Sequence, residues 1–146
     1  MRTVQRWVIA IGLVGLVGCG AVSDETAVTA SDVTGGDFAL LNGPDTPSTQ
    51  TVKRGSGTLF DILLESSGGF NGVVTFSIAG VPIKTTSHFS PATLTGSGDT
   101  FFIIQTINPS HDTNGGFGTP SGTYPLTVTG TSGALSHSVG ITLIVR

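Results

Sequence analysis

The chain contains the stretch Gly122-Thr123-Tyr124-Pro125-Leu126-Thr127-Val128-Thr129-Gly130-Thr131. From Tyr124 to Val128 its larger side chains occupy every second position, with proline or threonine between them. Because successive side chains of a β-strand point to opposite faces of the sheet, this alternation is typical of a strand with one face in a protein core. The stretch therefore predicts a strand over residues 123–131, with Tyr124, Leu126 and Val128 facing inward. Because proline cannot donate a hydrogen bond to a neighbouring strand, we expect Pro125 in a first, unpaired part of this strand.

Similar alternating runs fill the chain from Asp37 onward, separated by clusters of Gly, Pro, Asn and Ser. No segment has the apolar spacing of a helix over three turns. We expect strands at residues 37–41, 49–53, 57–66, 72–79, 85–89, 100–107, 123–131 and 135–145. Short strands separated regularly by turn residues predict an all-β sandwich.

The parity of these strands also predicts the core. The expected inward side chains are Phe38, Leu40, Phe60, Ile62, Leu64, Val74, Phe76, Ile78, Phe89, Phe102, Ile104, Tyr124, Leu126, Val128, Val139, Ile141, Leu143 and Val145. Asp61 and Glu65 are expected to face outward. Each fully buried side chain of this size stabilises the fold by about 1.5–3 kcal/mol, so this core can hold a domain without disulfides.

Taken together, these runs resemble a bacterial immunoglobulin-like repeat. The resemblance rests on residues 122–131 with Ser136-His137-Ser138-Val139, and on Asp37-Phe38, Gln50-Thr51-Val52, Gly69-Phe70-Asn71-Gly72, Gly80-Val81-Pro82 and Phe89-Ser90-Pro91. It covers nearly all of residues 37–146 and implies an immunoglobulin-like Greek-key β-sandwich of about seven to eight strands. Tyr124, two residues before the inward Leu126, matches the tyrosine corner of such domains, where its hydroxyl bonds to nearby backbone.

The N-terminal segment is typical of an export signal. Arg2 and Arg6 precede an apolar run from Trp7 to Val17, of about the 7–15 residues expected. The run ends in Leu16-Val17-Gly18-Cys19, which resembles the lipobox of bacterial lipoproteins. That resemblance implies cleavage before Cys19 and acylation of its thiol and amino group, and two or more acyl chains make a stable membrane anchor. Gly20, in place of an aspartate, implies the outer membrane.

Two other interpretations of this segment are weaker. A transmembrane helix needs about 20 apolar residues, and this run is shorter and contains Gly12, Gly15 and Gly18. A plain secretory signal would favour an Ala-x-Ala-like cleavage site. The expected organisation is a lipoprotein signal peptide at residues 1–18, a lipidated flexible tether at 19–36 and the immunoglobulin-like domain at 37–146.

Charge and cysteine content exclude several functions. Cleavage would remove two of the six basic residues and leave Lys53, Arg54, Lys84 and Arg146 against nine acidic residues. Such a chain has no basic footprint for nucleic acid. With Cys19 as the single cysteine, disulfides and cysteine-based zinc sites are excluded as well.

The sequence offers little that points to catalysis. The three histidines, His88, His111 and His137, have no partners at metal-ligand spacing. His111-Asp112, in the long connection 108–121, is the one polar pair of interest, either as a metal or catalytic pair or as a solvated turn. We expect no catalytic residues, no metal and no cofactor.

One group of apolar residues is not explained by the core. Parity points Leu59, Leu63, Phe101 and Ile103 outward, on two strands that are neighbours in an immunoglobulin-type sandwich. They would form an exposed patch, and large patches of this kind mark interaction surfaces. The alternatives are a strand read out of register, a bulge, or cover by the long connection through Phe117.

The expected function is that of a non-catalytic, lipid-anchored module of the cell envelope. It would recognise an envelope protein or a glycan through a sandwich face or through the long connection, with His111, Asp112 and Phe117 as candidates there. The alternative is a structural spacer or assembly subunit of an envelope complex. An accessory domain with hydrolytic activity is the remaining possibility.

Overall fold

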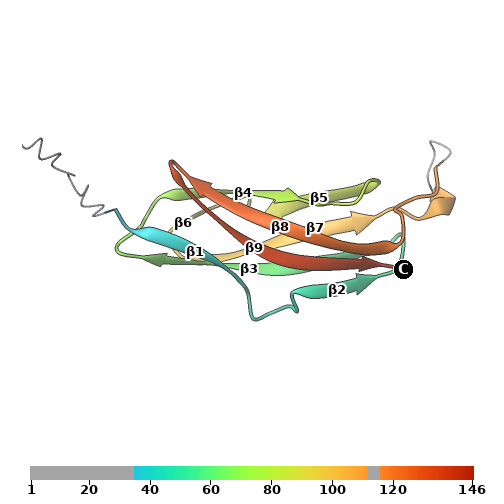
Figure 1. The fold of residues 1–146 in the computed structure, drawn as a ribbon, viewed down its shortest axis with the longest axis horizontal. Helices are drawn as coiled ribbons and strands as arrows, with labels where there is room; N and C mark the ends of the chain where they lie inside the picture. The colour runs from blue at the N-terminus through green and yellow to red at the C-terminus, as the bar shows by residue number, and fades with distance from the viewer. Residues whose placement is uncertain (1–34, 112–115) are drawn as a thin grey trace, which may run out of the picture. The chain divides into compact units, whose positions relative to one another are not determined.

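A computed structural model describes residues 35–111 and 116–146 of the chain. These residues form nine β-strands and a short 3-10 helix, η1 (Figure 1). The elements are β1 (Asp37–Asn42), β2 (Thr49–Val52), β3 (Gly57–Ser67), β4 (Val73–Ala79), β5 (Thr85–Ser90), β6 (Thr93–Thr95), β7 (Gly98–Thr106), η1 (Pro109–His111), β8 (Gly122–Ser132) and β9 (Leu135–Val145). The expected signal peptide and most of the expected tether lie outside the described residues. Within the described ranges, no helix has the length and apolar character needed to cross a membrane.

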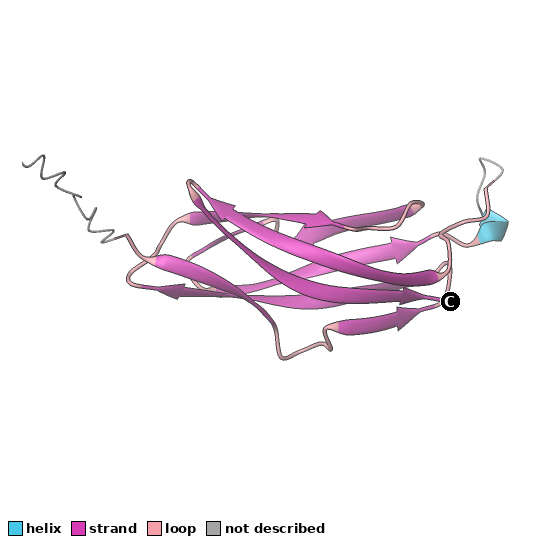
Figure 2. Cartoon of the chain, viewed as in Figure 1, coloured by secondary structure: helices cyan, strands magenta, loops and turns pink. Residues whose placement is uncertain are grey.

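The strands form two sheets (Figure 2). One sheet has the order β1-β3-β7-β5 and is antiparallel throughout. The other has the order β2-β9-β8-β4-β6, in which β2 runs parallel to β9. The first order corresponds to the ABED sheet of an immunoglobulin domain, and β9-β8-β4 corresponds to its GFC sheet. The immunoglobulin-like sandwich expected from the sequence is confirmed.

The core lies between the two sheets and contains the predicted residues. All the side chains expected to point inward are either buried or packed against the buried cluster. Phenylalanine rings connect the sheets: the Phe76 and Phe89 ring centroids are 5.5 Å apart, and those of Phe89 and Phe102 are 5.1 Å apart. Phe76, on β4, lies where many immunoglobulin domains place a tryptophan.

Two details of the strands differ from the expectation. β6 is a ninth, three-residue strand that pairs with β4, and no alternating run in the sequence marks it. Pro125 was expected in an unpaired first part of its strand, but it pairs with Thr142 of β9. The pairing of β8 with β4 stops at Thr127, so only one edge of β8 is open at Pro125.

Asp61 was expected to face solvent, but its side chain is buried, with 2% of its surface exposed. The chain leaves β1 at Asn42 and passes Asp61 on its way to the second sheet. The Gly43 N–H donates to the Asp61 carbonyl (2.9 Å), and the Asp61 N–H donates to Thr46 Oγ1 (2.7 Å). Asp61 Oδ2 accepts from the Asp45 N–H (3.1 Å). Strand parity gave the direction of the side chain correctly, but the β1–β2 connection covers it.

The strands run between two ends of the sandwich. At one end β1, β4 and β9 begin, and β3 and β8 end; we call it the tether end because β1 follows the segment expected to be a tether. At the loop end, β2, β7 and β9 end, and β3, β5 and β8 begin. Figure 1 shows residue 146 at the same end as the connection between β7 and β8.

Candidate functional site

The outer face of the β1-β3-β7-β5 sheet carries the predicted apolar residues. The register between β3 and β7 is continuous from Gly57↔Gln105 to Leu64↔Gly98, and it places Leu59 opposite Ile103. Leu59 is 40% exposed, and Leu63, Phe101 and Ile103 are partly exposed. A misread register and a bulge are therefore both wrong as explanations of the pattern.

Leu41 extends this surface onto β1. It lies opposite Leu63 in the β1–β3 ladder and is 41% exposed. The sequence analysis missed it because the alternation in β1 is short and ends in Leu40-Leu41. We call Leu41, Leu59, Leu63, Phe101 and Ile103 the outer apolar face.

The connection between β7 and β8 does not cover this face through Phe117. The Phe117 side chain is 87% exposed. That explanation of the apolar residues is therefore wrong too. Of the polar pair singled out in the sequence, Asp112 lies outside the described residues, and of His111 the structure describes the backbone at the end of η1.

Tyr124 forms the expected tyrosine corner. Its hydroxyl donates a hydrogen bond to the Pro120 carbonyl, four residues upstream, with an oxygen–oxygen distance of 2.9 Å. The ring packs partly against the core. Tyr124 therefore ties the end of the β7–β8 connection to the start of β8, as in immunoglobulin domains.

The loop end has a second set of polar contacts, built around Thr106. Its side chain is buried at the end of β7. The hydroxyl accepts from the Gly55 N–H (2.9 Å) and donates to the Ser56 carbonyl (2.7 Å). The Gln105 side-chain amide donates to the Gly55 carbonyl (2.9 Å). These bonds hold the β2–β3 turn, and with it Lys53 and Arg54, against β7.

Thr119 has the same role in the β7–β8 connection. It is fully buried, and its hydroxyl accepts from the Ile107 N–H (2.8 Å) and donates to the Lys84 carbonyl. The preceding Gly118 has a φ of 68°, and a Cβ there would lie 2.7 Å from Pro109 N. Only glycine fits such a close approach without displacing backbone. The β4–β5 and β7–β8 connections are thus joined at the loop end.

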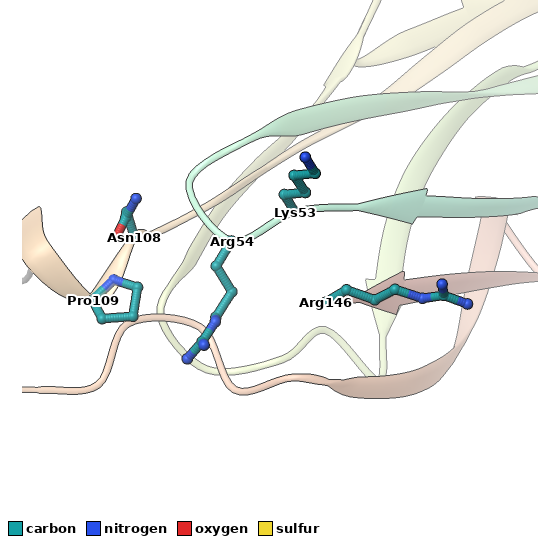
Figure 3. A pocket seen from close by; sticks show the side chains of 5 residues that line it. All are labelled: Lys53, Arg54, Asn108, Pro109 and Arg146. Carbon is teal, nitrogen blue, oxygen red and sulfur yellow. The ribbon is translucent and has the colours of Figure 1, made fainter.

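An open cavity of about 420 Å³ lies at this end, lined by Lys53, Arg54, Asn108, Pro109 and Arg146. The Arg146 N–H donates to the Val52 carbonyl and the Arg54 N–H donates to the Arg146 carbonyl, both at 2.9 Å. These bonds place Arg146 opposite Lys53 on the parallel neighbouring strand. Figure 3 shows that the charged ends of Lys53, Arg54 and Arg146 point in different directions.

Charge is separated between the two ends of the described domain. All four of its lysines and arginines lie at the loop end, whereas Asp37, Glu65 and Asp99 lie toward the tether end. The other two described carboxylates, Asp45 and Asp61, lie between the ends, at the β1–β2 connection. Within residues 35–111 and 116–146, no carboxylate lies at ion-pair distance from Lys53, Arg54 or Arg146. This cluster was not predicted from the sequence, although each cation stands at or near the end of an expected strand.

At the tether end, the side chains of Asp37 and His137 form a hydrogen bond. Asp37 Oδ1 and His137 Nε2 are 2.8 Å apart, and both side chains are partly exposed. The hydrogen bond from His137, followed by that from the Phe38 N–H, lowers the pKa of Asp37 below its usual 3.8. The His137 ring also packs edge-on against Phe38 (4.8 Å between centroids), so the pair closes this end of the core.

No cluster of three or more potential metal ligands is found among the described residues. His88 lies on the exposed face of β5, opposite Ile103, and His137 is paired with Asp37. The polar groups described above hold connections and strand ends in place.

No protein-family model matches the chain, and no curated protein matches it either. The following solved structures align with the chain at TM-scores below 0.5. Domains 4 and 5 of the S-layer protein SbsC align at 17% identity with a TM-score of 0.44, over 75% of this chain and 53% of that one. The chain thus spans about half of that structure's length.

Two further structures align with this chain over most of their own length. The CooA pilin subunit from enterotoxigenic Escherichia coli aligns at 13% identity and a TM-score of 0.41, over 75% of this chain and 95% of its own. A PapD-like domain of human CEP192 aligns at 11% identity and a TM-score of 0.41, over 90% of this chain and 96% of its own. At these values the comparisons carry no inference about function.

Proposed function

We propose that this chain is a non-catalytic binding module of the bacterial cell envelope, anchored by acyl chains on Cys19. It binds another envelope protein through the outer apolar face. The observation that carries this proposal is the register of β1, β3 and β7, which aligns Leu41 with Leu63 and Leu59 with Ile103 on the solvent side of one sheet. Apolar side chains gathered on the solvent side of neighbouring strands are typical of protein interaction sites.

The chemistry of the face favours a protein partner over a glycan. Its side chains are aliphatic except for Phe101, and Asp61, the carboxylate between Leu59 and Leu63, is covered by the β1–β2 connection. A sugar would require polar groups to pair with its hydroxyls, since unpaired polar groups are costly to bury. An apolar protein surface requires none.

The anchor is tested by Cys19→Ser in the full chain. Acylation predicts that the wild-type protein fractionates with membranes and takes up labelled palmitate. The variant should lose the label and keep a larger, uncleaved N-terminus, because lipobox processing depends on the cysteine. A Cys19→Ser protein of unchanged size in the membrane fraction would contradict the lipid anchor.

The binding face is tested by photo-crosslinking in cells. A photoreactive residue at Leu59 should yield a crosslinked product of defined mass. The same residue at Thr127, exposed on β8 of the opposite sheet, is the matched control and should yield none. Equal crosslinking at the two positions would show that the outer apolar face has no particular role.

A further inference from the structure

We infer that the loop end of the sandwich is a second interaction surface, which contacts an anionic lipid membrane. Lys53, Arg54 and Arg146 would meet the negatively charged headgroups there. Phe117 and Ile83 would enter the boundary between headgroups and acyl chains. This inference concerns residues other than the outer apolar face and does not depend on the function proposed above.

The loop end carries positive charges that favour contact with an anionic surface. Three cations line one open cavity, and the described residues provide them with no carboxylate partner. Lys53 and Arg146 stand side by side directly after the parallel ladder of β2 and β9, and like charges on neighbouring strands repel each other. An anionic surface removes this repulsion, and each lysine or arginine near such a membrane contributes about a fivefold gain in binding.

The loop end also carries two highly exposed apolar side chains. Phe117 and Ile83 are 87% and 72% exposed, the largest values among the exposed large hydrophobic residues of the described chain. Both lie at the loop end, in the two connections that Thr119 joins. Cationic residues beside exposed large apolar ones are the combination by which proteins bind at membrane interfaces.

The two groups of residues are contiguous. Gly118 follows Phe117, and its Cα lies so close to Asn108 and Pro109 that a Cβ there would be within 3 Å of both backbones. Asn108 and Pro109 are themselves part of the cavity wall next to Arg54. The Thr106 and Thr119 hydrogen bonds hold the β2–β3 turn and this connection in place.

The geometry favours a membrane over a single small anion. A site for one phosphate or carboxylate would have its donors converging on a point, as in bidentate arginine recognition. Here the charged ends of Lys53, Arg54 and Arg146 diverge (Figure 3), which suits contact with several headgroups spread over a surface. The acidic residues toward the tether end, Asp37, Glu65 and Asp99, would be repelled by that surface and so favour approach by the loop end.

The test places a tryptophan reporter at Phe117 of the full chain, reconstituted into vesicles. Trp7, the one native tryptophan, is replaced by Phe. In vesicles of equal parts phosphatidylcholine and phosphatidylglycerol, Phe117→Trp should show blue-shifted emission and quenching by brominated acyl chains. In pure phosphatidylcholine it should show neither. Val73→Trp, which replaces an exposed valine at the tether end, is the matched control and should stay unquenched.

Charge variants complete the test. For each of Lys53→Gln, Arg54→Gln and Arg146→Gln, the ratio of inserted to free reporter should fall about fivefold, whereas Arg54→Lys should keep it. Absence of quenching in anionic vesicles, equal quenching in neutral vesicles, or equal quenching at Val73→Trp would overturn the inference. Displacement by millimolar inorganic phosphate, or an Arg54→Lys variant as weak as Arg54→Gln, would show a small-anion site instead.

Discussion

Lys53 and Arg146 lie opposite one another directly after the last pair of the parallel ladder between β2 and β9. The Arg146 N–H donates to the carbonyl of Val52, and the Arg146 carbonyl accepts from the N–H of Arg54, each at 2.9 Å. Both side chains are exposed. Two like charges are thus held on neighbouring strands at the loop end, in a domain that has four basic residues.

Replacing one of these charges should stabilise the domain. In Lys53→Glu the repulsive pair becomes an attractive one, and cross-strand pairs of opposite charge contribute about 0.2–1 kcal/mol. The free energy of unfolding from denaturant titration should rise by about that amount at low salt, and the gain should shrink at high salt. Lys53→Gln is the control and should give a smaller increase. A loss of stability in Lys53→Glu would show that the pair is not repulsive.

Tyr124→Phe should destabilise the domain modestly. The variant loses the hydroxyl that donates to the Pro120 carbonyl, but that bond is solvent-accessible, so water can replace the donor. We expect a loss of about 0.5–1.5 kcal/mol in unfolding free energy, the usual net value of one hydrogen bond. Tyr124→Leu should cost more, because it also removes ring contacts with the core. Unchanged stability in Tyr124→Phe would mean that the corner bond contributes nothing.

The Asp37–His137 pair predicts a stability change at acid pH. Because the folded-state pKa of Asp37 lies below its unfolded value, its contribution is fully present above pH of about 4. It is lost as the pH falls through the lowered folded-state pKa. In Asp37→Asn this part of the pH dependence should be absent from urea unfolding curves. The same acid dependence in wild type and variant would assign it to other carboxylates.

The sequence predicted the sheets and the core well because both depend on a local period of two. Phe60, Ile62 and Leu64 alternate with polar or outward residues, and every one of them is buried as expected. β6 could not be predicted in this way, since three residues are too few to show alternation. The direction of Asp61 followed from parity, but its burial depends on the path of residues 43–46, which is a tertiary feature.

The two candidate surfaces differ in how far the sequence reveals them. The outer apolar face followed from parity within β3 and β7, where Leu59, Leu63, Phe101 and Ile103 all point outward. The cationic cluster at the loop end could not be predicted from the sequence. Its residues come from separate parts of the chain: Lys53, Arg54, Lys84 and Arg146. Only the pairing of β2 with β9 and of β5 with β7 brings their strand ends to the same side of the sandwich.

We propose that the outer apolar face serves binding and not folding. The most direct test measures both properties on one protein, the Leu59→Ser/Ile103→Ser double variant, with Ile62→Ser as the matched core control. We expect the double variant to keep its unfolding free energy within about 1 kcal/mol of wild type, as is usual for surface changes, and to lose the crosslink formed from a photoreactive residue at Leu63. Ile62→Ser should lose several times more stability. A double variant that unfolds as readily as Ile62→Ser, or that keeps the full crosslink, would contradict the claim.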